Sequence, residues 1–261
     1  MSNEILKITQ HREFPVPSTP WIMKQTWNDL LFAHWPVRVK DIRDVIPSSL
    51  KIDEYDGFAW IGVVPFHMSN IRIRFLPTLP FTSNFPEINV RTYVKYKGKA
   101  GVYFFSLDAM NHLAVFMSRK LFALNYFYAN IKHTSRSDNN YYESKRKGKD
   151  KVLAGFTGSY KPTSKPYRSI RDSFDYWLTE RYCLFCNDKN YLYRGDIHHL
   201  PWELQHAEAE IVENSMTSPI GINLSSDKPI LHFSKKMDAL LWKLTKVGDF
   251  IYSQHKTPTL N

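Results

Sequence analysis

The chain has 261 residues, with 35 lysines and arginines against 25 aspartates and glutamates, and its formal net charge is +10. Hydrophobic residues make up 43% and aromatic residues 15%, which supports a sizeable core and favours strands over a helical bundle. No run of about 18 apolar residues occurs, so no membrane span is expected. The charged N-terminal segment does not resemble a secretory signal, and the chain has only two cysteines. We therefore expect a cytoplasmic protein without a structural disulfide.

The N-terminal half of the chain predicts an extended segment followed by strands. Residues 1–20 are polar and end in a proline-rich stretch, which indicates an extended lead-in. A strand is expected near Phe32, a short amphipathic helix over residues 40–47, and two strands over residues 50–53 and 57–66. We see no linker long enough to separate two units, so residues 21–250 are predicted to form one domain before a polar tail over residues 251–261.

Residues 85–128 form the central stretch of the sequence. Residues 87–95 alternate between polar and apolar side chains, as in a strand, and the polar face holds an acid, an amide, a guanidinium and a phenol: Glu87, Asn89, Arg91 and Tyr93. Lys97, Gly98 and Lys99 indicate a turn, and residues 102–107 predict the returning strand. A helix is expected over residues 112–124.

The polar face of the first strand has two interpretations. It could point into a cavity, where its four groups would form a site for a small polar ligand. It could instead be an outward, solvated face with a structural Glu–Arg pair, which periodicity alone slightly favours. The sequence pattern leaves both interpretations open.

The C-terminal half predicts further hairpins. Residues 141–146 and 151–160 should form a hairpin, residues 173–181 a helix with Ser173 as its N-cap, and residues 182–186 and 191–197 another hairpin. Residues 207–211, 229–233 and 240–247 are expected to complete the fold. The basic run at residues 145–151 lies at the tip of the first of these hairpins. It contains no aromatic residue, so it suits a solvated loop better than a platform for nucleic acid.

Two motifs could bind a metal but favour a structural role. Cys183 and Cys186 form a lone CxxC pair, and residues three apart in a strand point to opposite faces, so we expect two core thiols. His198 and His199 are adjacent and should point apart in extended chain, which indicates a structural loop packed by Trp202. We therefore predict no metal and no cofactor, and no phosphate-binding or hydrolase motif occurs.

Four segments carry a resemblance to a known family. Residues 45–68, 85–109, 178–185 and 198–208 resemble the YqjF-like family of uncharacterised, mostly bacterial proteins, and the resemblance extends over nearly all of residues 21–245. It implies a mainly β, acetoacetate-decarboxylase-like fold: a cone-shaped antiparallel β-barrel around a small-molecule cavity, with a few flanking helices.

The same resemblance argues against decarboxylation through a Schiff base. Acetoacetate decarboxylase uses a lysine whose pKa is lowered by a neighbouring lysine. Arg119 matches the arginine of the corresponding motif, but Lys120 replaces its glutamate, and Tyr126 and Phe127 stand where the lysine pair would be. Glu87 falls at a position similar to the active-site glutamate of that enzyme. A phenol cannot form an imine, so the resemblance implies a site without Schiff-base chemistry.

These observations give one leading hypothesis and two alternatives. The leading hypothesis is a cavity that binds, and can transform, a small polar or carboxylate-bearing molecule. In it Arg91 and Arg119 hold an anionic group, Glu87 is the acid–base group, Tyr126 donates a hydrogen bond, and Asn89 and Tyr93 contact the ligand. The first alternative is a non-catalytic binding or scaffold protein. The second is an RNA- or anionic-surface-binding protein that uses the basic loop at residues 145–151. The sequence does not indicate the oligomeric state.

Overall fold

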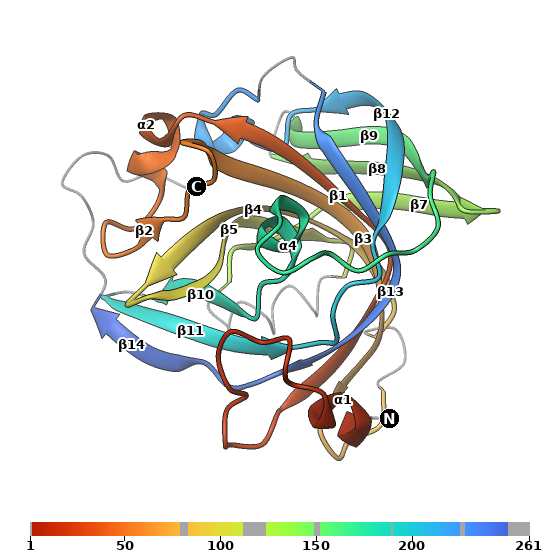
Figure 1. The fold of residues 1–261 in the computed structure, drawn as a ribbon. Coiled ribbons are helices and arrows are strands. Elements are labelled where there is room, and N and C mark those ends of the chain that lie inside the picture. The colour runs from red at the N-terminus through yellow and green to blue at the C-terminus, as the bar shows by residue number, and fades with distance from the viewer. Residues whose placement is uncertain are drawn as a thin grey trace.

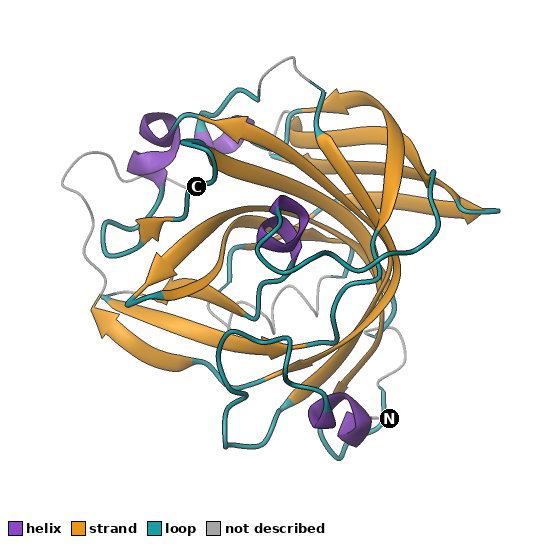
Figure 2. Ribbon diagram, in the orientation of Figure 1, coloured by secondary structure: helices purple, strands orange, loops and turns teal. Residues whose placement is uncertain are grey.

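Strands dominate the described part of the chain, where they belong to one 14-stranded sheet with short helices around it (Figures 1 and 2). In this computed structural model the described residues are 2–78, 83–111, 124–148, 152–188, 190–224 and 228–249. The expected helix at residues 112–124 therefore lies, apart from the non-helical Leu124, outside the described residues. Within the described ranges, no helix has the length and apolar character needed to cross a membrane.

The strands follow the alternation of the sequence and are mostly antiparallel. Their bounds are β1 (Met23–Val37), β2 (Lys51–Ile52), β3 (Ala59–Ile73), β4 (Phe85–Tyr96), β5 (Lys99–Ala109), β6 (Tyr126–Tyr128), β7 (Asn130–Arg136), β8 (Asn139–Lys147), β9 (Val152–Pro162), β10 (Cys183–Asp188), β11 (Tyr191–His198), β12 (Gln205–Asn214), β13 (Ile230–Leu241) and β14 (Thr245–Asp249). The parallel pairs are β5 with β6 and β5 with β10. The predicted hairpins β4–β5, β8–β9 and β10–β11 are all present.

Within the described residues the helices are short. They are α1 (Ser2–Lys7), α2 (Val39–Ile42), α4 (Phe174–Thr179) and the 3₁₀ turns η1 (Arg43–Val45) and η2 (Ser218–Ile220). The predicted N-cap of α4 is confirmed, because the Ser173 hydroxyl accepts a hydrogen bond from the Tyr176 amide at 3.3 Å. The expected extended lead-in is wrong in part. The helix α1 lies within this segment, and its Ile5 packs in a buried apolar cluster with Trp242, close to the C-terminal end of the sequence.

Seven strands close into a ring. Along the sheet the order is β11, β10, β5, β4, β3, β1 and β13, and β11 also pairs with β13 through Ile197 opposite Leu241. Strands β12, β9, β8 and β7 continue from β13 outside this ring, at the upper right of Figure 1. A ring of this kind has an inner and an outer face, so strands such as β4 are buried on both.

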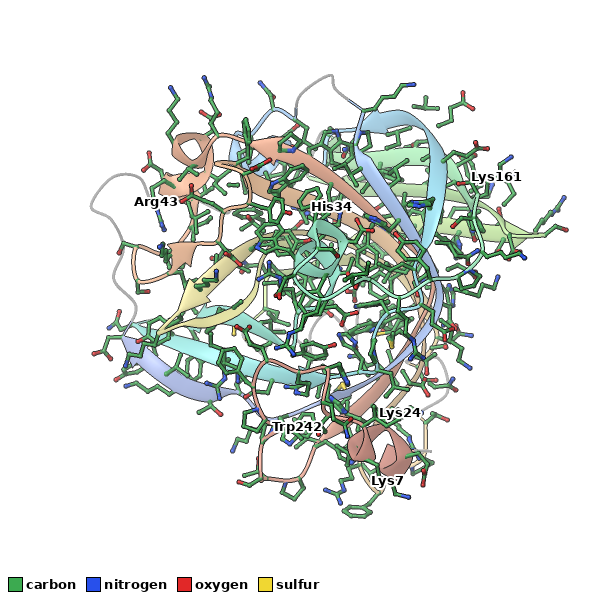
Figure 3. All side chains as sticks on the ribbon, viewed as in Figure 1. Lys7, Lys24, His34, Arg43, Lys161 and Trp242 are labelled. Carbon is green, nitrogen blue, oxygen red and sulfur yellow. The ribbon has the colours of Figure 1, made fainter. Side chains whose placement is uncertain are left out.

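The two faces of the ring strands meet different cores. Side chains on one face, such as Val63 and Val90, pack with Tyr142 and Phe156 of the outer strands into the largest apolar cluster. The opposite face of the ring strands carries two smaller apolar clusters and the polar groups described below. Figure 3 shows His34 near the middle of the molecule and Lys7 and Lys161 at its margins, as burial of the imidazole predicts.

The β4–β5 hairpin has the turn that its sequence predicts. Lys97 and Gly98 both have positive φ angles, 48° and 81°, which a two-residue hairpin turn of the primed type requires. Glycine meets this demand without the steric cost of a Cβ atom. The turn sets the register in which Tyr96 faces Lys99, and this register carries the polar row of β4 to the inner face.

The basic run at residues 145–151 differs from a uniformly solvated loop. Lys145, Arg146 and Lys147 belong to β8, and only the segment beyond them forms the tip, of which residues 149–151 lie outside the described residues. Lys145 pairs with Glu143, whereas Arg146 is buried. The expectation failed for Arg146 because strand alternation turns its side chain inward.

Candidate functional site

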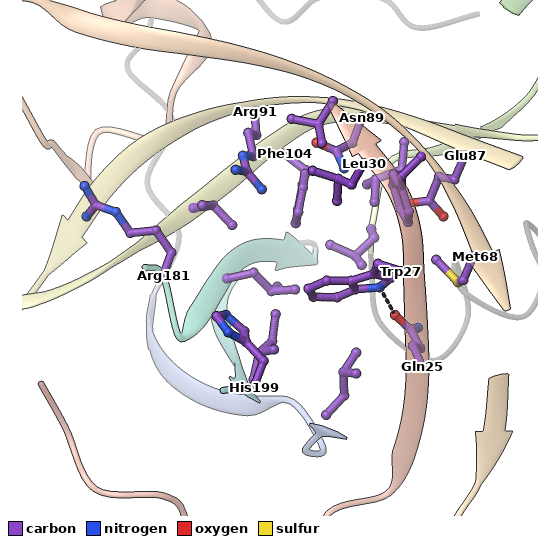
Figure 4. A pocket seen from close by; sticks show the side chains of 18 of the residues that line it. Gln25, Trp27, Leu30, Met68, Glu87, Asn89, Arg91, Phe104, Arg181 and His199 are labelled. Carbon is purple, nitrogen blue, oxygen red and sulfur yellow. Dashed lines mark hydrogen bonds between the residues drawn. The ribbon is translucent and has the colours of Figure 1, made fainter. Parts of the chain in front are cut away.

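A cavity of about 110 Å³ lies inside the ring, and every strand of the ring contributes to its wall (Figure 4). Most of the wall is apolar. The polar or amphipathic lining residues are Gln25, Trp27, Glu87, Asn89, Arg91, Tyr126, Thr179, Arg181, His199 and Trp202. An apolar hollow with a few convergent polar groups is the usual form of a small-molecule site.

Strand alternation explains which side chains reach the cavity. On β4 the lining residues are Glu87, Asn89 and Arg91, two apart in sequence and therefore on one face. At about 3.4 Å per residue, the Cα atoms of Glu87 and Arg91 lie roughly 14 Å apart, so the row spans the cavity. On β5 the lining residues change from Val102 and Phe104 to Leu107, because the register shifts between these positions.

Glu87 is a buried carboxyl at one end of this row. Its side chain is 2% exposed, and the Tyr126 hydroxyl donates a hydrogen bond to Glu87 Oε2 at 3.0 Å. Burial raises the pKa of Glu87 to about 8; the Tyr126 hydrogen bond opposes this rise, and the nearby Asp108 adds to it. Glu87 is therefore mostly protonated at pH 7 and able to donate or accept a proton near neutral pH.

Two arginines lie at the other end of the row, as Figure 4 shows. The guanidinium carbons of Arg91 and Arg181 lie 5.9 Å and 4.8 Å from the centre of the same Tyr93 ring. Among the described residues, the buried Nε of Arg91 and the buried Nη2 of Arg181 have no hydrogen-bond partner. Unpaired buried guanidinium nitrogens are costly, so this end of the cavity favours an anionic guest.

The other two nitrogen atoms of the Arg181 guanidinium form hydrogen bonds within the protein. Its Nε donates to the Trp177 carbonyl oxygen at 2.8 Å, and its Nη1 donates to Asp53 at 2.6 Å. Asp53 also pairs with Lys95 at 2.7 Å, so a single carboxylate is shared between two cations. Arg181 also borders a second hollow of about 260 Å³ between the lead-in and α4, which places it in the wall between the two hollows.

The predicted site residues are not all in one place. Glu87, Asn89, Arg91 and Tyr126 line the cavity together. Tyr93 does not line it: its hydroxyl lies 2.6 Å from His34 Nε2 and donates to the Leu178 carbonyl oxygen at 2.8 Å. Tyr93 therefore packs between the arginines as a support, and Arg119 lies outside the described residues.

A second buried ion pair lies next to Glu87. Arg146 holds Asp108 with two hydrogen bonds, one from Nε at 2.7 Å, and its guanidinium carbon lies 4.0 Å from the centre of the Phe127 ring. Burial raises the pKa of Asp108, whereas the Arg146 hydrogen bonds lower it. This pair ties β8 of the outer strands to β5 of the ring, just behind the Glu87 end of the cavity.

The His198–His199 pair points apart, as extended chain requires. His198 Nε2 contacts the Ile5 carbonyl oxygen at 2.9 Å, whereas His199 lines the cavity and stacks on Tyr182 with ring centres 4.6 Å apart. Burial lowers the pKa of His199 to about 3, so the ring is neutral. The ring of Trp202 lies 5.2 Å away, in line with the predicted packing of this loop.

The two cysteines occupy separate cores. Both are free and buried, with Cys183 in the largest apolar cluster and Cys186 in another. This confirms the prediction of two core thiols on opposite faces of a strand. Within the described part of the chain, no lysine lines the cavity and no group of three or more metal-binding side chains occurs.

One protein-family model matches most of the chain. The model of DUF2071, described as an uncharacterized conserved protein, matches residues 24–238. The chain belongs to the DUF2071 family. The uncharacterized protein YqjF of Bacillus subtilis is 52% identical over 237 residues, which cover 91% of this chain and 97% of that protein. The resemblance stated from the sequence is thereby confirmed.

Several solved structures with a similar fold are enzymes that act on small molecules. Acetoacetate decarboxylase from Legionella pneumophila has a TM-score of 0.61 at 14% identity, and the match covers 93% of this chain and 94% of that one. An acetoacetate decarboxylase-like enzyme from Sphingomonas wittichii has a TM-score of 0.62 at 11% identity, covering 91% and 98%. The enduracididine biosynthesis enzyme MppR, complexed with pyruvate, has a TM-score of 0.59 at 9% identity, covering 92% and 95%. These identities show the fold alone, and that fold is the predicted one.

Sequence reasoning missed Arg181, Thr179 and His199 as lining residues. All three lie more than eighty residues beyond the end of β4 and reach the cavity only because β10 and β11 join the ring. Arg181 comes two residues after the end of α4, and a cation just after an amphipathic helix is a common surface pattern. Nothing in the local sequence separates it from a solvated arginine.

Proposed function

We propose that the cavity binds a small molecule with a carboxylate at one end, held by Arg91 and Arg181, and a reactive polar group at the other, next to Glu87. The observation that carries this proposal is the asymmetry of the polar row: unpaired guanidinium nitrogens at one end and a protonated carboxyl at the other. A neutral Glu87 does not repel an anion, and it offers a proton to a carbonyl oxygen or a carbon atom.

The apolar wall and the small volume of the cavity limit which molecules it can bind. The wall between the two ends is formed by side chains such as Trp27, Leu30 and Phe104. A cavity of about 110 Å³ suits a molecule of few heavy atoms. Oxo acids have the matching chemistry, with a carboxylate for the arginines and a carbonyl group for Glu87. Two structural neighbours, named for acetoacetate and for a pyruvate complex, act on or hold molecules of this class.

The acid–base role of Glu87 does not require an imine. As an acid, protonated Glu87 donates its proton to the ligand and becomes a carboxylate that the Tyr126 hydroxyl stabilises. As a base, the carboxylate takes a proton from a carbon next to a carbonyl and returns it. The position that the resemblance aligns with the Schiff-base lysine is Tyr126, and in the described wall no lysine amine is available.

Calorimetric titration with pyruvate tests the binding half of the proposal. We expect binding to wild-type protein and a loss of at least tenfold in affinity in Arg91→Gln and in Arg181→Gln, because each removes a charged donor. Arg38→Gln is the matched control, since Arg38 is an exposed arginine paired with Asp41. Equal affinity in all four proteins would contradict the proposal, as would equal affinity for pyruvate and for its uncharged amide.

Deuterium exchange tests the acid–base half. In D₂O, proton NMR follows exchange of the methyl protons of pyruvate without any net reaction. We expect a protein-dependent rate that rises as pH passes through about 8, where Glu87 becomes a carboxylate, and that is lost in Glu87→Gln. Binding without exchange would instead favour the non-catalytic binding protein.

A further inference from the structure

Two histidines face each other where the ring meets the outer strands, away from the cavity. His67 comes from β3 and His133 from β7, the last strand of the outer extension (Figure 1). Their Nδ1 atoms are 3.5 Å apart, and their ring centres are 5.6 Å apart. Both side chains are partly exposed, so water and ions can reach them.

The hydrogen-bond network fixes the tautomer of His133. Asn140 Nδ2 donates to the Asp138 carbonyl oxygen at 3.0 Å, so the Asn140 amide oxygen faces His133 and lies 3.3 Å from its Nε2. His133 Nε2 must therefore carry the proton. A neutral imidazole has one N–H, and here it is the one on Nε2. Its Nδ1 is left with a lone pair.

His67 has the same arrangement. Its Nε2 forms a short contact with the amide oxygen of Asn84, which makes Nε2 the donor and leaves the lone pair on Nδ1. The two lone pairs then face each other across 3.5 Å. This separation exceeds the usual 2.7–3.2 Å of a hydrogen bond from nitrogen, so a shared proton does not satisfy both nitrogens. A cation between them does.

We propose that His67 Nδ1 and His133 Nδ1 together bind a divalent transition-metal ion of the zinc type. Zinc–nitrogen bonds of about 2.0–2.1 Å with a tetrahedral angle place two ligand nitrogens about 3.3–3.4 Å apart, close to the separation found here. Asn84 and Asn140 accept the outer N–H groups of the two rings, which is the usual second layer of contacts around metal-bound histidines.

The site is open and joins two parts of the fold. Among the described residues no third histidine, cysteine or carboxylate completes the set, so water fills the other metal positions and the ion exchanges readily. A metal bound here connects β3 of the ring to the β7–β8 hairpin.

Zinc titration against a chromophoric chelator tests the proposal on the full chain. We expect one zinc ion per wild-type protein, and loss of this binding in His67→Gln and in His133→Gln. Asn140→Leu should weaken it by about 10- to 100-fold, because it removes the outer partner of His133. His206→Gln is the matched control, since His206 is an exposed histidine outside this pair. Zinc affinity equal in wild type and His67→Gln would overturn the proposal.

Two further measurements keep the test independent of folding defects. Zinc should raise the thermal unfolding midpoint of the wild-type protein and leave the midpoint of His67→Ala unchanged. For each protein, the midpoint with zinc is compared with the midpoint of the same protein without metal. Nitrogen-15 NMR of the imidazoles should show zinc-dependent shifts at the Nδ1 atoms of both rings. An Nδ1-bound proton on either ring that persists with excess zinc would contradict the proposal.

Discussion

The Tyr126 hydroxyl donates a hydrogen bond to Glu87 Oε2 at 3.0 Å, and the two residues come from strands β6 and β4, which are connected only through β5. Among the described residues, the buried Glu87 carboxyl has a phenol as its hydrogen-bond partner and no paired cation. Burial without a neighbouring cation keeps the carboxyl protonated near neutral pH, and the Tyr126 hydrogen bond only partly opposes this.

Removing the phenol should raise the pKa of Glu87 further. Burial raises the pKa of Glu87 to about 8, and the hydrogen bond from Tyr126 limits that rise because it favours the charged form. We expect a titration midpoint near 8 in wild-type protein and a higher one in Tyr126→Phe, followed by carbon-13 NMR of the glutamate carboxyls. Tyr128→Phe, on the same strand but 42% exposed, is the control. A midpoint near 4.5 in wild type would contradict the burial argument.

Glu87 should make the protein less stable as pH rises. Its pKa is about 8 in the folded state against an ordinary 4.5, so between these values the folded state holds a proton that the unfolded state releases. The free energy of unfolding therefore falls with rising pH across this window, by at most about 5 kcal/mol. Glu87→Gln should gain stability relative to wild type from pH 5 to pH 8, measured by urea unfolding. Parallel pH profiles of the two proteins would refute this.

The buried pair of Asp108 and Arg146 should be strongly coupled. Arg146→Met leaves a buried carboxylate without its cation and should cost about 3–5 kcal/mol of unfolding free energy. Asp108→Asn combined with Arg146→Met should cost less than the sum of the single changes, because the uncompensated charge is gone. Lys145→Met, at a half-exposed neighbour on β8, should change stability by less than about 1 kcal/mol. Additive costs in the double-variant cycle would show that the pair is not coupled.

Cys183 and Cys186 should be inert in the folded protein. Burial raises the pKa of each thiol to about 12, and the two side chains lie in different apolar clusters. A thiol-specific chromophoric reagent should label neither cysteine in native protein and both after unfolding in denaturant. Rapid labelling of one cysteine in the native state, or an internal disulfide after mild oxidation, would contradict the assigned positions.

Much of the fold could be predicted from periodicity. The alternation of residues 87–95, the Lys97–Gly98 turn and the Ser173 N-cap each have a local cause, and the structure has the corresponding hairpin and helix start. Arg146 could not be placed from its neighbours, because a basic run predicts solvent exposure and only the partner Asp108 on another strand makes burial possible.

The candidate site was less predictable than the fold. Glu87, Asn89 and Arg91 share a face because of strand geometry, but whether that face meets solvent or a cavity depends on ring closure between β11 and β13. The same closure brings Arg181 and Arg91, ninety positions apart in sequence, to one cavity, and no local pattern contains this proximity. Tyr93 belongs to the predicted row, yet its hydroxyl is used by His34 and Leu178, which are likewise distant in sequence.

A crystal structure of the protein with a bound oxo acid such as pyruvate tests the central claim most directly. The proposal predicts the carboxylate within about 2.7–2.9 Å of nitrogen atoms of Arg91 and Arg181, and the carbonyl end directed along β4 toward Glu87. A carboxylate bound instead among Lys95, Lys99 and Arg171 in the second hollow, with the inner cavity filled only by water, would contradict it.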